Sequence, residues 1–435
     1  MNTVFHVIKY EWKNLWRSST LNVVMLVVFA AGIYGIFFGK FEIQKQELRT
    51  NQVQLYEQQQ FDSLLHWVAL DTSIVDNQSK YQQAVSPTGV GWNKHFTYYL
   101  TQETPASAGL CLGQRDLFPV YYGFNVSDLA RQVHMGELTN PMKLLTGNFD
   151  LSYVYIFLFP LLIVALFYDL FSGEKEGGTL LLLKSQGVSL AAILGSKALL
   201  RALIVWSLAF ILLVLGFLIQ GVSIVEHGQL FMNWLFVVFL YSATWMGLMG
   251  ILIWLRQSST LTAMLGLSVW LMFTLITPSI INLSIQATQP LPNRAEMINK
   301  VRNLNDQFWG SPKTQVLDQF YAEYPQYNDG DTTDFYKWYY AGFTIMDREA
   351  NVLNGQFEDK VEQRNSLLKK WEWLAPAAMV HEHLSKISDT DRESHLEFIK
   401  EVHAYHDYLK EFYYQRIFEG AVFTRSDLEE LAKTL

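Results

Sequence analysis

Five long stretches of almost uncharged, apolar residues constrain this chain more than any other feature of its sequence. Each is close to the roughly 20 residues that a helix needs to cross a bilayer, where unpaired backbone groups are too costly. They occupy residues 18–39, 151–170, 198–222, 230–255 and 261–284. Buried helices of a soluble protein are the alternative, but such helices rarely accept interior prolines such as Pro160 and Pro278. The sequence therefore predicts an α-helical polytopic membrane protein with five spans.

The charged residues lie mostly outside these stretches. Of 74 charged residues (33 basic and 41 acidic), 42 follow position 293 and 19 lie between 40 and 150, which leaves 13 for the rest. This distribution indicates a membrane core with two polar regions, residues 40–150 and 285–435. No basic cluster indicates nucleic-acid binding. The single cysteine, Cys111, excludes an internal disulfide framework and is interpreted as a packing residue.

Residues 1–17 are predicted to form an amphipathic helix on the membrane surface. At 100° per residue, an arc of about 120° holds the apolar side chains Val4, Phe5, Ile8, Trp12, Leu15 and Trp16. The opposite side holds His6, Lys9, Lys13 and Arg17. Tryptophan favours the membrane–water boundary, and basic side chains bind anionic headgroups. We therefore expect Lys9, Trp12, Lys13, Trp16 and Arg17 to anchor this helix to membrane lipids.

Lysine and arginine in the short loops predict the orientation, because such loops remain in the cytoplasm. The N-terminal segment, the loop of residues 171–197 and the link at Arg256 are basic, whereas the hairpin of residues 221–229 has neither lysine nor arginine. The N-terminus and the loop 171–197 are therefore expected in the cytoplasm, with both polar regions outside. An odd number of spans also puts the C-terminus outside, unless a sixth span follows Leu435.

Both polar regions are expected to be ordered and mostly helical. A helix should continue the first span to about residue 66, and further helices are expected at 294–308, 334–368 and 394–418. Residues 324–333, rich in Asp, Asn and Gly, are expected to form a loop. Because the second region is dense in aromatic residues, we expect the two regions to pack together as one extracytoplasmic cap.

The loop of residues 171–197 has the most informative pattern. It contains, in order, Glu174, Lys175, Glu176, Gly177, Gly178, Thr179, Leu180, Leu181, Leu182, Leu183 and Ser185. The two glycines allow a sharp reversal, after which Thr179 can cap a short helix of leucines. Such a helix is too short to span the bilayer and too apolar for water. It is therefore expected to dock in a groove of a partner protein.

This loop resembles the first intracellular loop of ABC-2 type transporter permeases. The resemblance is carried by the Glu-x-Glu-x-Gly-Thr-Leu run from Glu174, a later Ser-x-x-Val-Ser, and Lys197 at the next span. In that family the loop forms a coupling helix that inserts into an ATPase subunit, and an amphipathic helix precedes the first span. Trp373-Leu-Ala-Pro-Ala-Ala, with Phe398, His403-Ala-Tyr-His406 and Arg416-Ile-Phe418, is similar to a subset with large insertions after spans one and five. The family normally has six spans, so this chain departs from it.

The resemblance implies a type V exporter-like transmembrane domain in the bacterial inner membrane, with its large polar regions in the periplasm. It implies ABC ATPase subunits as partners, together with a second permease copy or a paralogue. A periplasmic or outer-membrane partner is a further expectation. The chain lacks the Gly-x-x-x-x-Gly-Lys-Ser/Thr loop that cradles phosphates, so ATP and Mg²⁺ are expected on the partner ATPase. This chain is expected to be no enzyme, to bind no cofactor, and to couple ATP hydrolysis to substrate export or mechanical work.

Several interpretations remain open at this point. His381, His383, His403 and His406 have the ligand chemistry of a metal site, but ordinary packing is favoured. Arg201 is expected to extend to the cytoplasmic interface. Gly247 and Gly250 permit close helix approach, either to a second permease or within the subunit. The alternative function is a membrane-anchored periplasmic enzyme or a metal-maturation or assembly factor, although no catalytic motif supports it.

Overall fold

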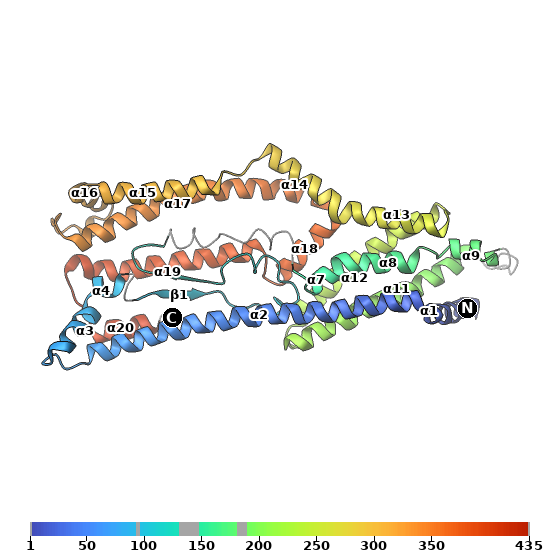
Figure 1. Ribbon diagram of the computed structural model, residues 1–435, viewed down its shortest axis with the longest axis horizontal. Coiled ribbons are helices and arrows are strands. Elements are labelled where there is room, and N and C mark those ends of the chain that lie inside the picture. The colour runs from blue at the N-terminus through green and yellow to red at the C-terminus, as the bar shows by residue number, and fades with distance from the viewer. Residues whose placement is uncertain (1, 93–95, 130–147, 181–188, 434–435) are drawn as a thin grey trace.

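The computed structural model describes residues 2–92, 96–129, 148–180 and 189–433. The molecule is elongated, with α1 and α9 at one end and α3, α4 and α16 at the other (Figure 1). Within these ranges, five helical segments are long and apolar enough to cross a membrane: Ser19–Val68, Leu151–Glu176, Leu190–Gln220, Gly228–Trp254 and Ser259–Thr288. The prediction of an α-helical membrane protein with five apolar helices is confirmed.

The first two helices are separated by a single residue. α1 (Asn2–Arg17) is followed by Ser18 and then by α2 (Ser19–Val68). The Ser18 hydroxyl accepts a hydrogen bond from the Leu21 N–H at 3.5 Å and so caps α2. α2 continues well beyond the apolar stretch, as expected. Glycine permits a very close contact on its inner face, because a Cβ at Gly39 would lie 1.8 Å from the carbonyl oxygen of Gly109.

The second and fifth spans both contain a π-helical turn just before a proline. α7 (Leu151–Tyr153) and η1 (Val154–Leu158) precede α8 (Phe159–Phe167), and Pro160 lies in the first turn of α8. α13 (Ser259–Leu271) and η2 (Met272–Ile276) likewise precede α14 (Thr277–Thr288), whose first turn contains Pro278. Proline has no N–H and its ring clashes with the carbonyl one turn earlier, and the wider turn relieves both problems.

The second span forms the centre of the bundle. It is followed by α9 (Ser172–Glu176), α11 (Leu190–Gln220) and α12 (Gly228–Trp254). α11 ends at Gly221, which takes a left-handed conformation (φ 81°) and turns the chain back into α12. In the most apolar window of each span, 67% of the second span is buried but only 11% of the fifth. Of the five spans, the fifth is therefore the least enclosed by the rest of the described chain.

Where the structure describes them, the polar regions combine helices with one small sheet. The first region contains α3 (Val75–Val85), α4 (Pro87–Gly91), β1 (Tyr98–Thr101) and β2 (Tyr121–Phe124). The second contains α15 (Arg294–Gly310), α16 (Lys313–Glu323), η3 (Pro325–Tyr327), α17 (Phe335–Trp371), η4 (Glu372–Leu374), α18 (Pro376–Ile387), α19 (Arg392–Glu419) and α20 (Arg425–Lys433). α15, α17 and α19 confirm the three helices expected there.

The two strands pair in antiparallel order, with Tyr98 opposite Phe124. Polar side chains of α2 bind the β1 segment: Glu57 accepts a hydrogen bond from the Tyr99 N–H at 2.9 Å, and Gln60 accepts one from the Thr97 N–H at 3.0 Å. These contacts hold the hairpin against the part of α2 that lies beyond the apolar stretch.

A second hydrophobic core draws residues from both polar regions. It includes Phe61 and Tyr98 from the first region, and Tyr340, Tyr413 and Leu428 from the second. The hydroxyls of Tyr98 and Tyr413 lie 2.5 Å apart in its interior. Because aromatic side chains bury large apolar areas, this core accounts for the order of both regions.

One helix of the second polar region packs into the spanning bundle instead. Ala377, Val380 and Leu384 of α18 are buried in the bundle core, and α18 contacts α12, η1 and η2. Just beyond its end, the Thr390 hydroxyl donates to the carbonyl oxygen of Cys111 at 2.9 Å. This return to the bundle was not predicted from the sequence.

Candidate functional site

A cluster of charged side chains lies at the end of the bundle where both α1 and α9 are found (Figure 1). It is formed by Glu11 of α1, Asp169 before α9, Glu174 of α9, and Lys197 and Arg201 of α11. Three segments of the sequence, around residues 11, 169–174 and 197–201, therefore meet around opposite charges. Lys197 and Arg201 are four residues apart on α11 and share one face of the helix.

Arg201 is the most buried member, with 4% of its surface exposed. Its Nε donates to Glu11 Oε1 at 2.8 Å, and its Nη1 donates to Asp169 Oδ1 at 2.6 Å and to the carbonyl oxygen of Leu166. That Arg201 extends to the cytoplasmic interface stays a prediction, but its side chain is buried within the protein. Two carboxylates within the protein hold its guanidinium, and planar, multiply bonded pairing of this kind suits arginine.

Glu11 joins the two basic residues of α11. It is 3% exposed, pairs with Arg201, and its Oε2 lies 3.1 Å from Lys197 Nζ. Lys197 also pairs with Glu174 of α9. α1, α9 and α11 are therefore connected through a continuous chain of ion pairs. Sequence reasoning missed the roles of Glu11 and Asp169. The signal available was the single acid of the basic helix and the four-residue spacing of Lys197 and Arg201.

α9 is also bonded to the start of the fifth span. Glu176 Oε1 accepts a hydrogen bond from the Ser259 N–H at 2.8 Å, and the Ser259 hydroxyl donates to the Ser172 hydroxyl oxygen at 2.7 Å. A carboxylate is favourable here because the first N–H groups of a helix have no partner within the helix. The Arg256 guanidinium lies 5.9 Å from the centre of the Phe171 ring, on the same side of this junction.

The tip of the loop is exposed from Lys175 to Thr179. Gly178 has a φ of 72°, a left-handed conformation that makes the expected reversal. The Thr179 hydroxyl donates back to the carbonyl oxygen of Glu174 at 3.2 Å and to its carboxylate. Thr179 therefore closes the turn onto α9, and the predicted role of Thr179 as a helix cap stays a prediction, because the helix concerned lies outside the described ranges. Leu180 is the last described residue, and the predicted positions Leu181, Leu182, Leu183 and Ser185 lie outside the described ranges.

α1 divides its predicted apolar arc between the protein and the outside. Leu15 is buried against the bundle together with Glu11, whereas Trp12 and Trp16 are 46% and 64% exposed. The predicted anchors Lys9, Lys13 and Arg17 are also exposed. Both tryptophans and all three basic residues are therefore free to contact lipid, although Leu15 is not.

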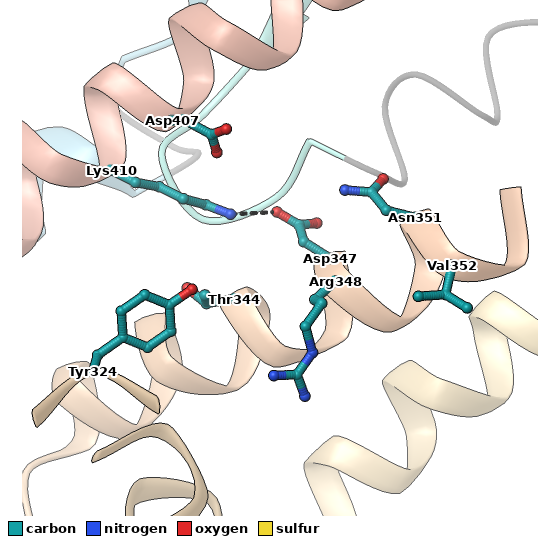
Figure 2. A pocket seen from close by; sticks show the side chains of 8 residues that line it. All are labelled: Tyr324, Thr344, Asp347, Arg348, Asn351, Val352, Asp407 and Lys410. Carbon is teal, nitrogen blue, oxygen red and sulfur yellow. Dashed lines mark hydrogen bonds and ion pairs between the residues drawn. The ribbon is translucent and has the colours of Figure 1, made fainter. Parts of the chain in front are cut away.

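A polar pocket of about 400 Å³ lies between α17 and α19 (Figure 2). It is lined by Tyr324, Thr344, Asp347, Arg348, Asn351, Val352, Asp407 and Lys410. Lys410 Nζ lies 2.9 Å from Asp347 Oδ2 at its base. Burial by itself lowers the pKa of Lys410, but Asp347, Tyr414 and Asp407 together outweigh burial and raise it. Arg348 pairs with Glu323, so most of the charge here is neutralised within the protein.

The histidines considered as metal ligands are dispersed. His406 is buried and its Nε2 donates to the carbonyl oxygen of Asn125 at 3.2 Å, whereas His383 is exposed near Glu372. Burial lowers the pKa of both His403 and His406. Within the described part of the chain, no three His, Cys, Asp or Glu side chains are arranged to hold a metal ion. His406 is a packing residue, and His381 and His383 belong to α18 instead.

Comparison with known proteins gives one match. Residues 294–433, which comprise α15 to α20, match the model of a domain of unknown function, DUF3526. No curated protein and no solved structure matches the chain. The matched region includes α18, so it reaches from the second hydrophobic core into the spanning bundle.

Proposed function

We propose that this chain is the transmembrane permease subunit of an ATP-driven transporter of the ABC-2 type. A partner ATPase docks on the loop 171–197, and ATP hydrolysis there moves the spanning helices to export a substrate or to perform mechanical work. The observation that carries this proposal is the charged cluster together with the hydrogen bond between Glu176 and Ser259, because these contacts tie the loop to α1, α11 and α13 at once.

A displacement of α9 reaches three helices through short contacts. Glu174 of α9 pairs with Lys197 of α11, and Lys197 also pairs with Glu11 of α1. A displacement of α9 therefore displaces α11 and α1 as well. Glu176 accepts a hydrogen bond from the Ser259 N–H, which connects α9 to α13 in the same way. Buried ion pairs resist separation, because removing one partner strands a charge in a poorly solvated site. The loop and these helices therefore move together, as a coupling element requires.

The orientation in this proposal follows from the basic residues of the loops. α1 and the loop 171–197 lie in the cytoplasm, where a soluble ATPase reaches them, and the two polar regions form a cap in the periplasm. ATP and Mg²⁺ bind to the partner, since this chain has no phosphate-binding loop. A Cβ on Gly247 or Gly250 would meet no described atom within 4 Å, so this face of α12 is open to a second permease copy or a paralogue.

Two substitutions in the loop test the proposal. Glu176→Ala removes the bond to Ser259, and Gly178→Pro blocks a φ of 72° that proline cannot adopt. Both variants are expected to insert in the membrane and to retain the co-purifying ATPase, but to lose transport-linked stimulation of ATP hydrolysis. Glu226→Ala, in the hairpin at the opposite end of α12, is the control. Unchanged stimulation in both loop variants, or the absence of any ATPase from affinity purifications, would refute the coupling role.

A further inference from the structure

The end of α17 and the short η4 helix expose large aromatic and basic side chains. Trp371 and Trp373 are 50% and 68% exposed, and Leu368 is 36% exposed. Lys369 and Lys370 precede them and are exposed as well. Exposed tryptophans are costly in water, so their concentration beside two lysines indicates a surface with a partner.

The position of this segment is set by the helices on either side of it. α18 begins two residues after η4, and its Ala377, Val380 and Leu384 are buried in the core of the spanning bundle. α18 also contacts α7 and η1, which form the start of the second span. Residues 368–374 therefore lie at the end of the bundle opposite α1, level with the ends of the spanning helices.

On the other side of this segment, a contact between α17 and α14 fixes its position. α17 approaches α14 (Figure 1), and Arg364 Nη2 donates to Asn282 Oδ1 at 3.5 Å. On α14, Ile280 and Leu283 are 57% and 64% exposed, and α14 belongs to a helix that is apolar enough to cross a membrane. The exposed aromatic residues of α17 and η4 therefore lie beside apolar side chains that the rest of the chain leaves uncovered.

We propose that Leu368–Trp373 is a second membrane anchor, in the leaflet opposite the one bound by α1, and that it binds anionic phospholipid headgroups. Trp371 and Trp373 lie at the boundary between hydrocarbon and headgroups, where their amphipathic rings are most stable. Lys369 and Lys370 contact the phosphate groups, and basic residues near an anionic surface favour binding.

The local charge supports a lipid rather than a neutral partner. From residue 364 to 373 the chain has three basic residues and one acid, Glu372. Glu372 Oε1 lies 3.9 Å from His383 Nδ1 and is only partly exposed, and the segment keeps a net positive charge with Glu372 counted. The proposal depends only on the membrane location of the five apolar helices, and it holds whether or not an ATPase partner exists.

The tryptophans are tested by quenching with brominated lipids. The full chain is reconstituted in nanodiscs whose lipids are brominated near the headgroup. Because the chain has 13 tryptophans, each site is measured as the difference between wild type and a Trp→Phe variant. Trp373→Phe is compared with Trp309→Phe, since Trp309 is 50% exposed at the end of α15. We expect the Trp373 difference signal to be quenched and the Trp309 signal to be unaffected. A Trp373 signal that brominated lipid leaves unchanged would refute the anchor and favour a protein partner.

The lysines are tested by headgroup preference. Native mass spectrometry of the purified full chain, titrated with phosphatidylglycerol and with phosphatidylcholine, measures the ratio of their affinities. Lys369→Gln/Lys370→Gln is expected to lower the preference for phosphatidylglycerol by roughly tenfold, while the melting temperature is unchanged. The matched control is Lys300→Gln/Lys360→Gln, which removes two exposed lysines from α15 and α17 away from η4. Equal ratios in the two double variants would refute headgroup binding at this segment.

Discussion

Glu11 is the residue through which α1 is held to the bundle, so Glu11→Gln is the most informative single substitution. The change keeps the size of the side chain but removes a carboxylate that is 3% exposed and pairs with both Arg201 and Lys197. Two positive charges four residues apart on α11 then lose their shared partner. We expect α1 to separate from α11 more readily and the folded state to be less stable.

The expected loss of folding free energy in Glu11→Gln depends on which partners Arg201 and Lys197 keep. Removing one partner of a buried ion pair costs about 3–5 kcal/mol when the other charge is stranded. Arg201 still bonds to Asp169 and to the Leu166 carbonyl, and Lys197 still pairs with Glu174. The loss is therefore expected near 2 kcal/mol, below the range for a fully stranded charge. The exposed pair of Glu296 and Lys300 is the control, and Glu296→Gln is expected to cost less than about 0.5 kcal/mol.

Two measurements detect the effects of Glu11→Gln. Denaturant unfolding gives the loss of stability, and a spin label at Tyr10→Cys reports the mobility of α1. The label is specific because the only native cysteine, Cys111, is buried. Tyr10 is 77% exposed, so the label itself does not disturb packing. Equal stability of Glu11→Gln and Glu296→Gln, together with an unchanged spin-label spectrum, would refute the role assigned to Glu11.

Three further predictions concern packing, pH and the pocket. Gly39→Ala is expected to destabilise the fold by about 3 kcal/mol in denaturant unfolding, because the new Cβ would lie 1.8 Å from the Gly109 carbonyl oxygen. Burial lowers the pKa of His395 to about 4, so only the unfolded chain gains its proton as the pH falls below 6.5. The free energy of unfolding should therefore fall by about 1.4 kcal/mol when the pH is lowered from 7.5 to 5.5. His395→Phe should abolish this contribution to the pH dependence. Lys410→Met is expected to destabilise the fold by about 2 kcal/mol, because it removes the cation that pairs with the buried Asp347 carboxylate, and adding Asp347→Asn should restore part of it.

The sequence predicts the elements of this fold that depend on local composition. The five apolar helices, the continuation of the first span and the main helices of the second polar region all follow from length and periodicity. The reversal at Gly178 follows from the glycine pair alone. Each of these features is set by residues close to one another in the chain.

The features that were missed depend on contacts between distant segments. Glu11 and Arg201 are 190 residues apart, and a single acid in a basic helix gives no indication of which cation it meets. The return of α18 to the bundle was missed because the whole helix has only 12 residues, whereas a membrane span needs about 20. Its buried face is completed by residues of α12 and η2, which the sequence does not bring together.

The central claim is that the exposed tip of the loop 171–197 meets an ATPase, and site-specific photocrosslinking in native membranes tests it most directly. A photoreactive amino acid is placed at Lys175, which is exposed at the tip, and separately at Glu226 in the hairpin at the opposite end of α12. The account predicts that Lys175 alone forms an adduct with an ATPase containing a phosphate-binding loop, and that ATP changes its yield. The absence of any ATPase adduct at Lys175, or an equal adduct at Glu226, would contradict it.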